Sequence, residues 1–175
     1  MMLIAPTHPD WPALVAHLHR VNDARWVLDD EDKPHASTYF LAIEYGDAII
    51  ASLTLKRQPI TIPATDWSGG ETHWLCGPGN LPLEELFVQT FSVEEAHRRQ
   101  GHGVALQRAG LALAADLGCY QVRSWSSLDR PANYALKLKL GFAVHPAIFA
   151  TDTGLEVSGV YFVKTINMLA DKLKG

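Results

Sequence analysis

A strand-like run that opens through a glycine-rich turn into a helix-like run constrains this chain more than any other feature. The strand is expected over Glu84–Val93 and the helix over Val104–Leu117, and the turn between them has the pattern Arg98-x-x-Gly101-x-Gly103. Such a turn leaves backbone N–H groups unpaired at the positive end of the helix dipole, an arrangement that binds phosphate. The turn therefore predicts a phosphorylated ligand.

The other elements follow from hydrophobic periodicity and from turn residues. Strands are expected over Leu3–Thr7, Thr38–Tyr45, Ala48–Leu55, Tyr120–Trp125, Phe142–Ala150 and Glu156–Ile166. Helices are expected over Trp11–Val21, Ala24–Leu28, Arg130–Leu140 and Met168–Lys174. The segment 58–82 follows no period. It is either a substrate wall or an inert insertion that contains a short strand at Glu71–Leu75.

The order of these elements predicts the fold class. Strands and helices alternate in the middle of the chain, which implies parallel pairing there, while the hairpins imply antiparallel edges. We expect one α/β (α+β) domain over residues 1–175, with a central mixed sheet of about six to seven strands and helices on both faces. The terminal strand pair offers an edge on which a second copy could form a homodimer.

Composition excludes several classes of function. The formal net charge of −4 argues against a nucleic-acid partner. The chain lacks a signal-peptide pattern and any run of about 18 apolar residues, so a cytoplasmic protein without a membrane span is expected. Cys76 and Cys119 form no disulfide or metal-ligand pattern, and the histidines are spaced as surface residues, so no metal is expected.

A second signature, Leu138-Lys139-Leu140-Gly141-Phe142, ends the next strand–helix unit. With the glycine turn, it resembles the GNAT superfamily of acyl-CoA-dependent N-acyltransferases over residues from about 83 to 142. The resemblance implies that the turn holds the pyrophosphate of coenzyme A. The implied contacts are Val93, Arg98, Arg99, Gln100, Gly101, His102, Gly103, Val104 and, on the second helix, Asn133. Nucleotide motifs fit less well, because no Lys-Ser/Thr pair follows the glycines.

The resemblance also implies three catalytic roles. The backbone N–H of Phe91 would bind the thioester oxygen, and Glu85 would act as the base that deprotonates an amine. Many members carry a tyrosine acid where this chain has Lys137, and Tyr134 lies one helical turn earlier as a substitute. The alternatives are a solvated strand end for Glu85 and a packing role for Tyr134.

The expected function is therefore transfer of an acetyl group from acetyl-CoA to a primary amine, by direct attack in a ternary complex. The acceptor is a small molecule or a peptide that the sequence does not identify. Two other functions remain open. The first is a non-catalytic CoA-binding or regulatory module, and the second is a nucleotide enzyme with a similar fold.

Overall fold

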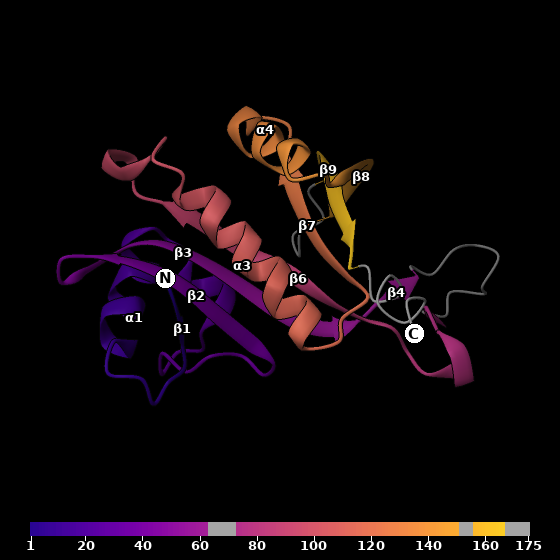
Figure 1. Ribbon diagram of the computed structural model, residues 1–175, viewed down its shortest axis with the longest axis horizontal. Coiled ribbons are helices and arrows are strands. Elements are labelled where there is room, and N and C mark those ends of the chain that lie inside the picture. The colour runs from indigo at the N-terminus through magenta and orange to yellow at the C-terminus, as the bar shows by residue number, and fades with distance from the viewer. Residues whose placement is uncertain (63–72, 151–155, 167–175) are drawn as a thin grey trace, which may run out of the picture.

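Seven strands form one mixed sheet in the computed structural model, in the order β1-β2-β3-β6-β7-β9-β8 (Figure 1). The structure describes residues 1–62, 73–150 and 156–166. The strands are β1 (Met2–Ile4), β2 (Thr38–Tyr45), β3 (Ala48–Pro59), β6 (Glu84–Val93), β7 (Gln121–Ser127), β9 (Glu156–Thr165) and the edge strand β8 (Ala143–Ala150). A separate pair joins β4 (Thr61–Ile62) to β5 (His73–Trp74).

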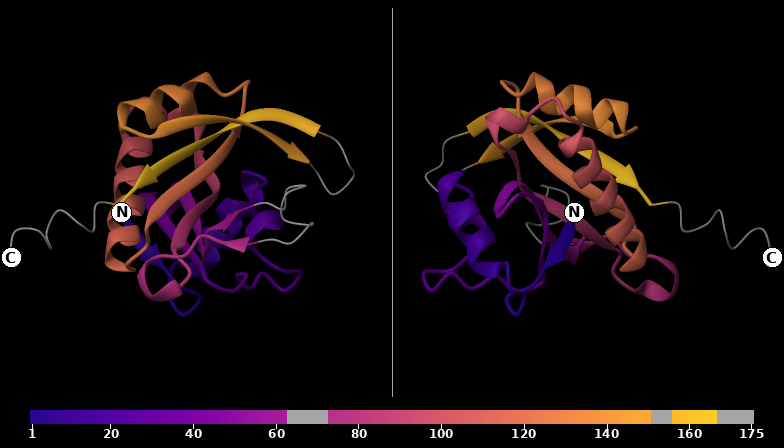
Figure 2. Two further views of the ribbon diagram at one scale, coloured as in Figure 1. Left: turned by 90° about the vertical axis from the view of Figure 1, so that its right-hand side faces the viewer. Right: turned by 60° about the vertical axis from the view of Figure 1, so that its left-hand side comes forward.

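Helices cover both faces of the large sheet, as the sequence predicts (Figure 2). On one face lie α1 (Trp11–Arg20) and α2 (Ala24–Val27), and on the other α3 (His102–Asp116) and α4 (Pro131–Lys139). Two 3-10 turns, Pro78–Asn80 and Glu95–His97, lie in connecting segments. None of the described helices is long and apolar enough to cross a membrane.

Each face has its own hydrophobic core, because alternate strand residues point to opposite sides. The core under α1 and α2 contains Leu14, Leu18, Val27, Phe40 and Ile49, and the core under α3 contains Leu53, Leu55, Leu86, Leu106 and Val122. Gly110 brings α3 close to the sheet, since a Cβ atom there would lie 3.0 Å from Leu53 Cδ2.

The parallel strands β6 and β7 separate part of the way along their length. Their pairing runs from Glu85 opposite Gln121 to Val88 opposite Ser124, although both strands continue further. At the same level β6 has a bulge at Gln89, where the register between β3 and β6 shifts by one residue. The two strands therefore diverge. We call the opening between residues 89–93 of β6 and residues 125–127 of β7 the split.

Most element predictions are confirmed, including β2 and β6 at both ends and the parallel pairing of β6 with β7. The main difference is β3, which runs four residues beyond the expected end at Leu55. The short strand expected at Glu71–Leu75 is confirmed in part by β5 at His73–Trp74, and residues 71–72 of that expectation lie outside the described residues. The first strand begins and ends earlier than expected, at Met2–Ile4. The helix expected at Met168–Lys174 lies outside the described residues.

Candidate active site

The turn before α3 presents an open helix N-terminus. Gly101 adopts a φ of +88° and Arg99 a φ of +64°, which curl the chain back on itself. The first helical bond runs from the Ala105 amide to the Gly101 carbonyl at 3.0 Å. The three amides between them therefore have no helical acceptor, and no described side chain caps them. Unpaired amides at a helix N-terminus are suited to binding an anion.

The side chains of the turn partly stabilise the loop itself. Arg98 Nε donates to the Val93 carbonyl at 3.0 Å, and Gln100 Nε2 donates to the Ala96 carbonyl at 3.3 Å. Arg99 is exposed and adds a second positive charge beside the helix N-terminus. The turn thus combines a fixed backbone with local positive charge, both of which favour phosphate binding.

The two glycines of the turn serve different purposes. Gly101 is surrounded by open space, and its positive φ is the reason that glycine suits this position. At Gly103, a Cβ atom would lie 3.1 Å from Phe91 Cζ and 3.4 Å from Leu136 Cδ2. Gly103 therefore makes room for the Phe91 ring and the Leu136 side chain.

The backbone of β6 directs N–H groups into the split. The Glu94 amide donates to the Ile50 carbonyl of β3 at 2.9 Å. Backbone groups alternate in direction along an antiparallel strand, so the amides two and four positions earlier also face β3. The amides of Phe91 and Val93 consequently face the opposite edge, where β7 has separated.

Buried polar atoms gather on both sides of the split without hydrogen bonds among the described residues. On the α3 and α4 face they are Ser124 Oγ, Asn133 Oδ1 and Tyr134 Oη. On the α1 and α2 face they are Asp23 Oδ2, Gln89 Oε1 and Thr90 Oγ1. Because buried polar groups are normally hydrogen-bonded, these atoms indicate a site that a polar ligand would complete. Sequence reasoning identified only Asn133 and Tyr134.

Glu85 is fully buried, and its carboxylate is bonded on both oxygens. Arg123 donates from Nε at 2.9 Å and from Nη2 at 2.5 Å. Gln121 Nε2 donates at 2.8 Å and Gln58 Nε2 at 3.0 Å. The group therefore joins β6 to its two neighbours. This arrangement favours a structural ion pair. The sequence suggested that Glu85 acts as the base, but a carboxylate bonded in this way is poorly placed to exchange protons with an amine.

Tyr134 and Lys137 lie on the same side of α4. The Tyr134 ring packs edge-on against Phe162, with ring centroids 5.0 Å apart, and its hydroxyl is buried. Lys137 is 1% exposed, and its Nζ donates to Gln107 Oε1 at 2.7 Å beneath the Phe142 ring. Burial lowers the pKa of Lys137 to about 7.

On the opposite face, a polar network joins α1 to the strands. His17 is fully buried, and its Nε2 lies 3.1 Å from Ser52 Oγ and 3.3 Å from Ser92 Oγ. Arg20 Nη2 approaches His17 Nδ1 at 3.3 Å and also donates to Glu94 at 2.5 Å. Burial, followed by the nearby Arg20 charge, lowers the pKa of His17.

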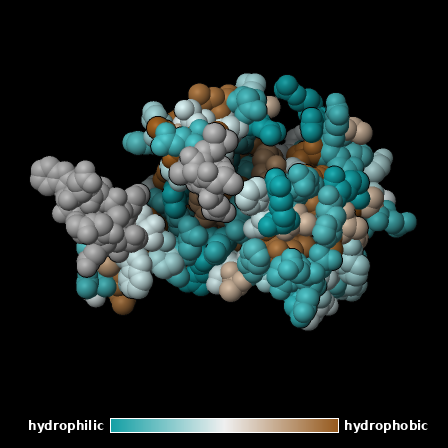
Figure 3. Space-filling model, turned by 180° about the vertical axis from the view of Figure 1, so that it is seen from behind, coloured by the Kyte–Doolittle hydropathy of each residue, from teal (hydrophilic) through white to brown (hydrophobic). Residues whose placement is uncertain are grey.

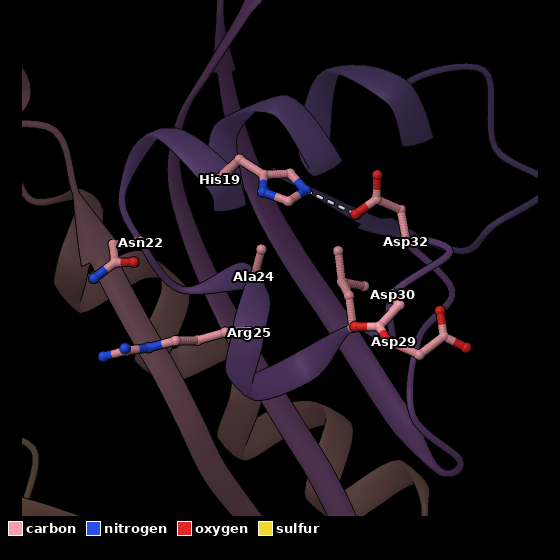
Figure 4. A pocket seen from close by; sticks show the side chains of 8 residues that line it. His19, Asn22, Ala24, Arg25, Asp29, Asp30 and Asp32 are labelled. Carbon is pink, nitrogen blue, oxygen red and sulfur yellow. Dashed lines mark hydrogen bonds and ion pairs between the residues drawn. The ribbon is translucent and has the colours of Figure 1, made fainter.

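A pocket of about 410 Å³ opens beside α1 and α2 (Figure 4). Its lining is mainly polar and comprises His19, Asn22, Ala24, Arg25, Leu28, Asp29, Asp30 and Asp32. Figure 3 shows the face of the molecule that lies at the back in Figure 1, and hydrophilic residues predominate on it. Among the residues that the structure describes, no three His, Cys, Asp or Glu side chains are grouped so that they could hold a metal ion.

Comparison with known proteins gives a family match and a common fold. Residues 6–142 match the family model described as Acetyltransferase (GNAT) family. Arabidopsis thaliana NAA60 in complex with acetyl-CoA has a TM-score of 0.64 at 15% sequence identity, over 94% of this chain and 100% of that chain. No significant match was found among curated protein sequences.

Two bacterial enzymes have the same fold. Ribosomal-protein-S18-alanine N-acetyltransferase from Escherichia coli has a TM-score of 0.58 at 15% identity, over 97% of this chain and 96% of that chain. Aminoglycoside 6'-N-acetyltransferase from Enterococcus faecium has a TM-score of 0.60 at 14% identity, over 95% of this chain and 97% of that chain.

Proposed function

Because the chain belongs to the acetyltransferase (GNAT) family, we propose that it transfers an acetyl group from acetyl-CoA to a primary amine. The observation that carries this proposal is the open N-terminus of α3 beside the split between β6 and β7. One feature binds a diphosphate, and the other accepts an extended chain that forms hydrogen bonds with strand edges. Coenzyme A has both parts.

The pyrophosphate would bind at the turn before α3. The amides of His102, Gly103 and Val104 supply donors, and Arg98 and Arg99 supply positive charge. Gln100 contributes by bonding the loop to the Ala96 carbonyl rather than by touching the ligand.

The pantetheine arm would lie in the split. The Val93 amide faces the split and would bond the arm, and Asn133 Oδ1 offers an unused acceptor for one of its amides. The Phe91 amide would donate to the thioester oxygen, whose negative charge grows when the amine attacks. One such donor contributes roughly 3 kcal/mol to the stability of a transition state.

The departing thiolate needs little help, because a thiol pKa of about 8.5 makes it a fair leaving group. Tyr134 is the residue that we propose as its proton donor, since the hydroxyl is buried and takes part in no hydrogen bond among the described residues. Lys137 is bonded to Gln107 and stands where many members of the family carry a tyrosine.

Direct attack is favoured over a cysteine-bound intermediate. Cys119 is fully buried, and burial raises the pKa of its thiol, so little thiolate forms near neutral pH. The acceptor would be a small-molecule or peptide amine that enters from the α1 and α2 side. The printed names of the similar structures include a ribosomal-protein alanine and an aminoglycoside as acceptors of those enzymes.

The test pairs a cofactor-site variant with a matched control. Gly101→Glu places bulk and negative charge where the diphosphate would bind, and it should abolish both acetyl-CoA binding in calorimetry and thiol release with a panel of amines. Gly46→Glu is the control, since Gly46 also has a positive φ of +61° and open surroundings but lies in the β2–β3 turn. It should bind acetyl-CoA as the wild type does.

The outcomes separate the candidate functions. Folded wild-type protein that gives no heat with either CoA or acetyl-CoA would contradict the proposal. Binding without thiol release across a broad amine panel would favour the regulatory module.

A further inference from the structure

The turn between α1 and α2 brings Asp23 to the edge of the split. Its amide donates to the Leu18 carbonyl at 2.8 Å, which holds the turn against the end of α1. The following helix, α2, meets β6 at the bulge, where Gln89 Nε2 donates to the Trp26 carbonyl at 3.5 Å. The Asp23 carboxylate lies beside the Thr90 hydroxyl on this bulged part of β6.

Asp23 Oδ2 is buried, and the carboxylate has no cation partner among the described residues. The cations nearest in sequence have other partners, because Arg20 donates to Glu94 and Arg25 lies over the Trp26 ring. The other ionisable groups on the packed elements are likewise bonded elsewhere: His17 to Ser52, His19 to Asp32, Glu84 to Arg57 and Glu85 to Arg123. Buried carboxylates are normally paired with a cation. The absence of such a partner for Asp23 in the part of the chain that the structure describes indicates that a cationic ligand would complete the site.

We propose that Asp23 binds the ammonium group of the acceptor and removes one of its protons, an inference that rests on the acetyl transfer proposed above. Gln89 Oε1 and Thr90 Oγ1 are two further buried oxygens on the bulge, and the Thr90 hydroxyl interacts with the Asp23 carboxylate. With Asp23 Oδ2 they make three acceptors, which match the three N–H bonds of a primary ammonium group.

The reaction balances with one proton released. Asp23 takes the first proton from the ammonium, and the nitrogen lone pair then forms a bond to the thioester carbonyl carbon. The C–S bond breaks, the second nitrogen proton passes to the departing thiolate, and the Asp23 proton leaves to solvent. The products are the N-acetyl amine and free coenzyme A.

The surroundings of Asp23 suit this role. Burial raises its pKa to about 6, and the Thr90 hydroxyl only partly offsets the rise. The carboxylate is thus ionised at neutral pH, yet it is a stronger base than an exposed aspartate. Glu85, by contrast, is saturated by Arg123, Gln121 and Gln58.

Kinetics of an isosteric variant test the inference. Asp23→Asn keeps the shape of the side chain and removes the proton acceptor, and Asp47→Asn removes an exposed carboxylate of the β2–β3 turn as the control. Acetyl transfer to spermidine, kanamycin and a tetrapeptide would be measured from about pH 5 to pH 9. For Asp23→Asn we expect kcat to fall about 100-fold and its rise near pH 6 to disappear. Affinity for acetyl-CoA should not change.

A second variant reports on the environment of the base. In Thr90→Val the rise in kcat should move to higher pH, because the hydroxyl lowers the pKa of Asp23. Asp23→Asn should also be at least as stable as the wild type toward urea at pH 7.5, since the ionised carboxylate has no cation partner. A marked loss of stability would overturn the inference in favour of a structural role.

The remaining outcomes are distinct. Full transfer by Asp23→Asn with an unchanged pH profile overturns the role of Asp23 and leaves the acetyltransferase function standing. Acetyl-CoA binding without transfer to any of these amines overturns the amine site. Failure of the wild type to bind acetyl-CoA overturns both proposals.

Discussion

At the scale of single residues, His17 shows how burial favours one protonation state. The ring is fully buried, and burial, followed by the Arg20 charge, lowers its pKa, so the neutral form is favoured. Arg20 Nη2 lies 3.3 Å and Glu94 Oε1 3.5 Å from Nδ1, while Nε2 faces Ser52 and Ser92. Either neutral tautomer therefore has hydrogen-bond partners on both ring nitrogens. The network joins α1 to β3 and β6.

This assignment predicts the response of stability to acid. The pKa of His17 lies below its usual 6.5 in the folded state. As the pH falls below 6.5, His17 therefore binds a proton more readily in the unfolded chain than in the native protein. The contribution of His17 to the free energy of unfolding should thus fall as the pH decreases from 7 to 5.5. His17→Gln should lack this loss in urea unfolding.

The comparison with His17→Gln is needed because Asp23 titrates in the opposite sense. The pKa of Asp23 is raised to about 6, so its contribution to stability increases as pH falls through 6. An acid-dependent loss of equal size in both proteins would contradict the assignment for His17.

Single residues were the hardest to predict from sequence. Glu85 reads as a strand-end carboxylate, and its burial depends on Arg123, which lies 38 positions later and reaches it only through the parallel register of β6 and β7. Asp23 is adjacent to Thr90 only because α2 packs on the bulge. Local sequence patterns contain neither contact. The Arg98, Gly101 and Gly103 pattern was readable because its geometry is local.

At the scale of elements, β7 and β9 depend on one glycine. Gly159 of β9 lies under the Trp125 ring, and a Cβ atom there would be 2.6 Å from Trp125 Cζ2 and would also collide with the Ser126 carbonyl. This close approach occurs where β7 has left β6, so the glycine helps to position the far wall of the split.

Gly159→Ala should therefore destabilise the protein by about 2 kcal/mol, because the ring and the strand must move apart. Ser158→Ala, at the exposed neighbouring position, should change the free energy of unfolding by less than about 0.5 kcal/mol. Urea unfolding measures both. Equal stabilities of the two variants would show that β9 adapts without strain.

Elements with a clear alternation were predicted well, as β2 and β6 show. The end of β3 was missed because Lys56, Arg57, Gln58 and Pro59 carry no apolar pattern. These residues are in the sheet because β6 pairs with them up to Pro59 opposite Glu84. Pairing with β6 therefore sets the end of β3, and the strand propensity of these four residues does not.

At the scale of the whole molecule, the split predicts strong stabilisation by the coenzyme. A ligand that binds only the native state at about 100 times its Kd adds about 2.7 kcal/mol to the free energy of unfolding. Acetyl-CoA should accordingly raise the melting temperature of the wild type and of Gly46→Glu, but not that of Gly101→Glu. Thermal melts with ATP and NAD are the controls, and protection by these nucleotides alone would favour the nucleotide enzyme.

The four residue pairs between β6 and β7 are the strand pairing that connects the two halves of the sheet. On one side are β1, β2, β3 and β6 with α1 and α2, and on the other are β7, β9 and β8. Beyond Val88 and Ser124 no strand pairing among the described residues connects the two halves. A bound pantetheine would therefore supply contacts that link β6 to β7 in this region. The acetyl donor would then contribute to the stability of the enzyme as well as to the reaction. Each release of coenzyme A would remove these contacts, and binding of the next acetyl-CoA would restore them.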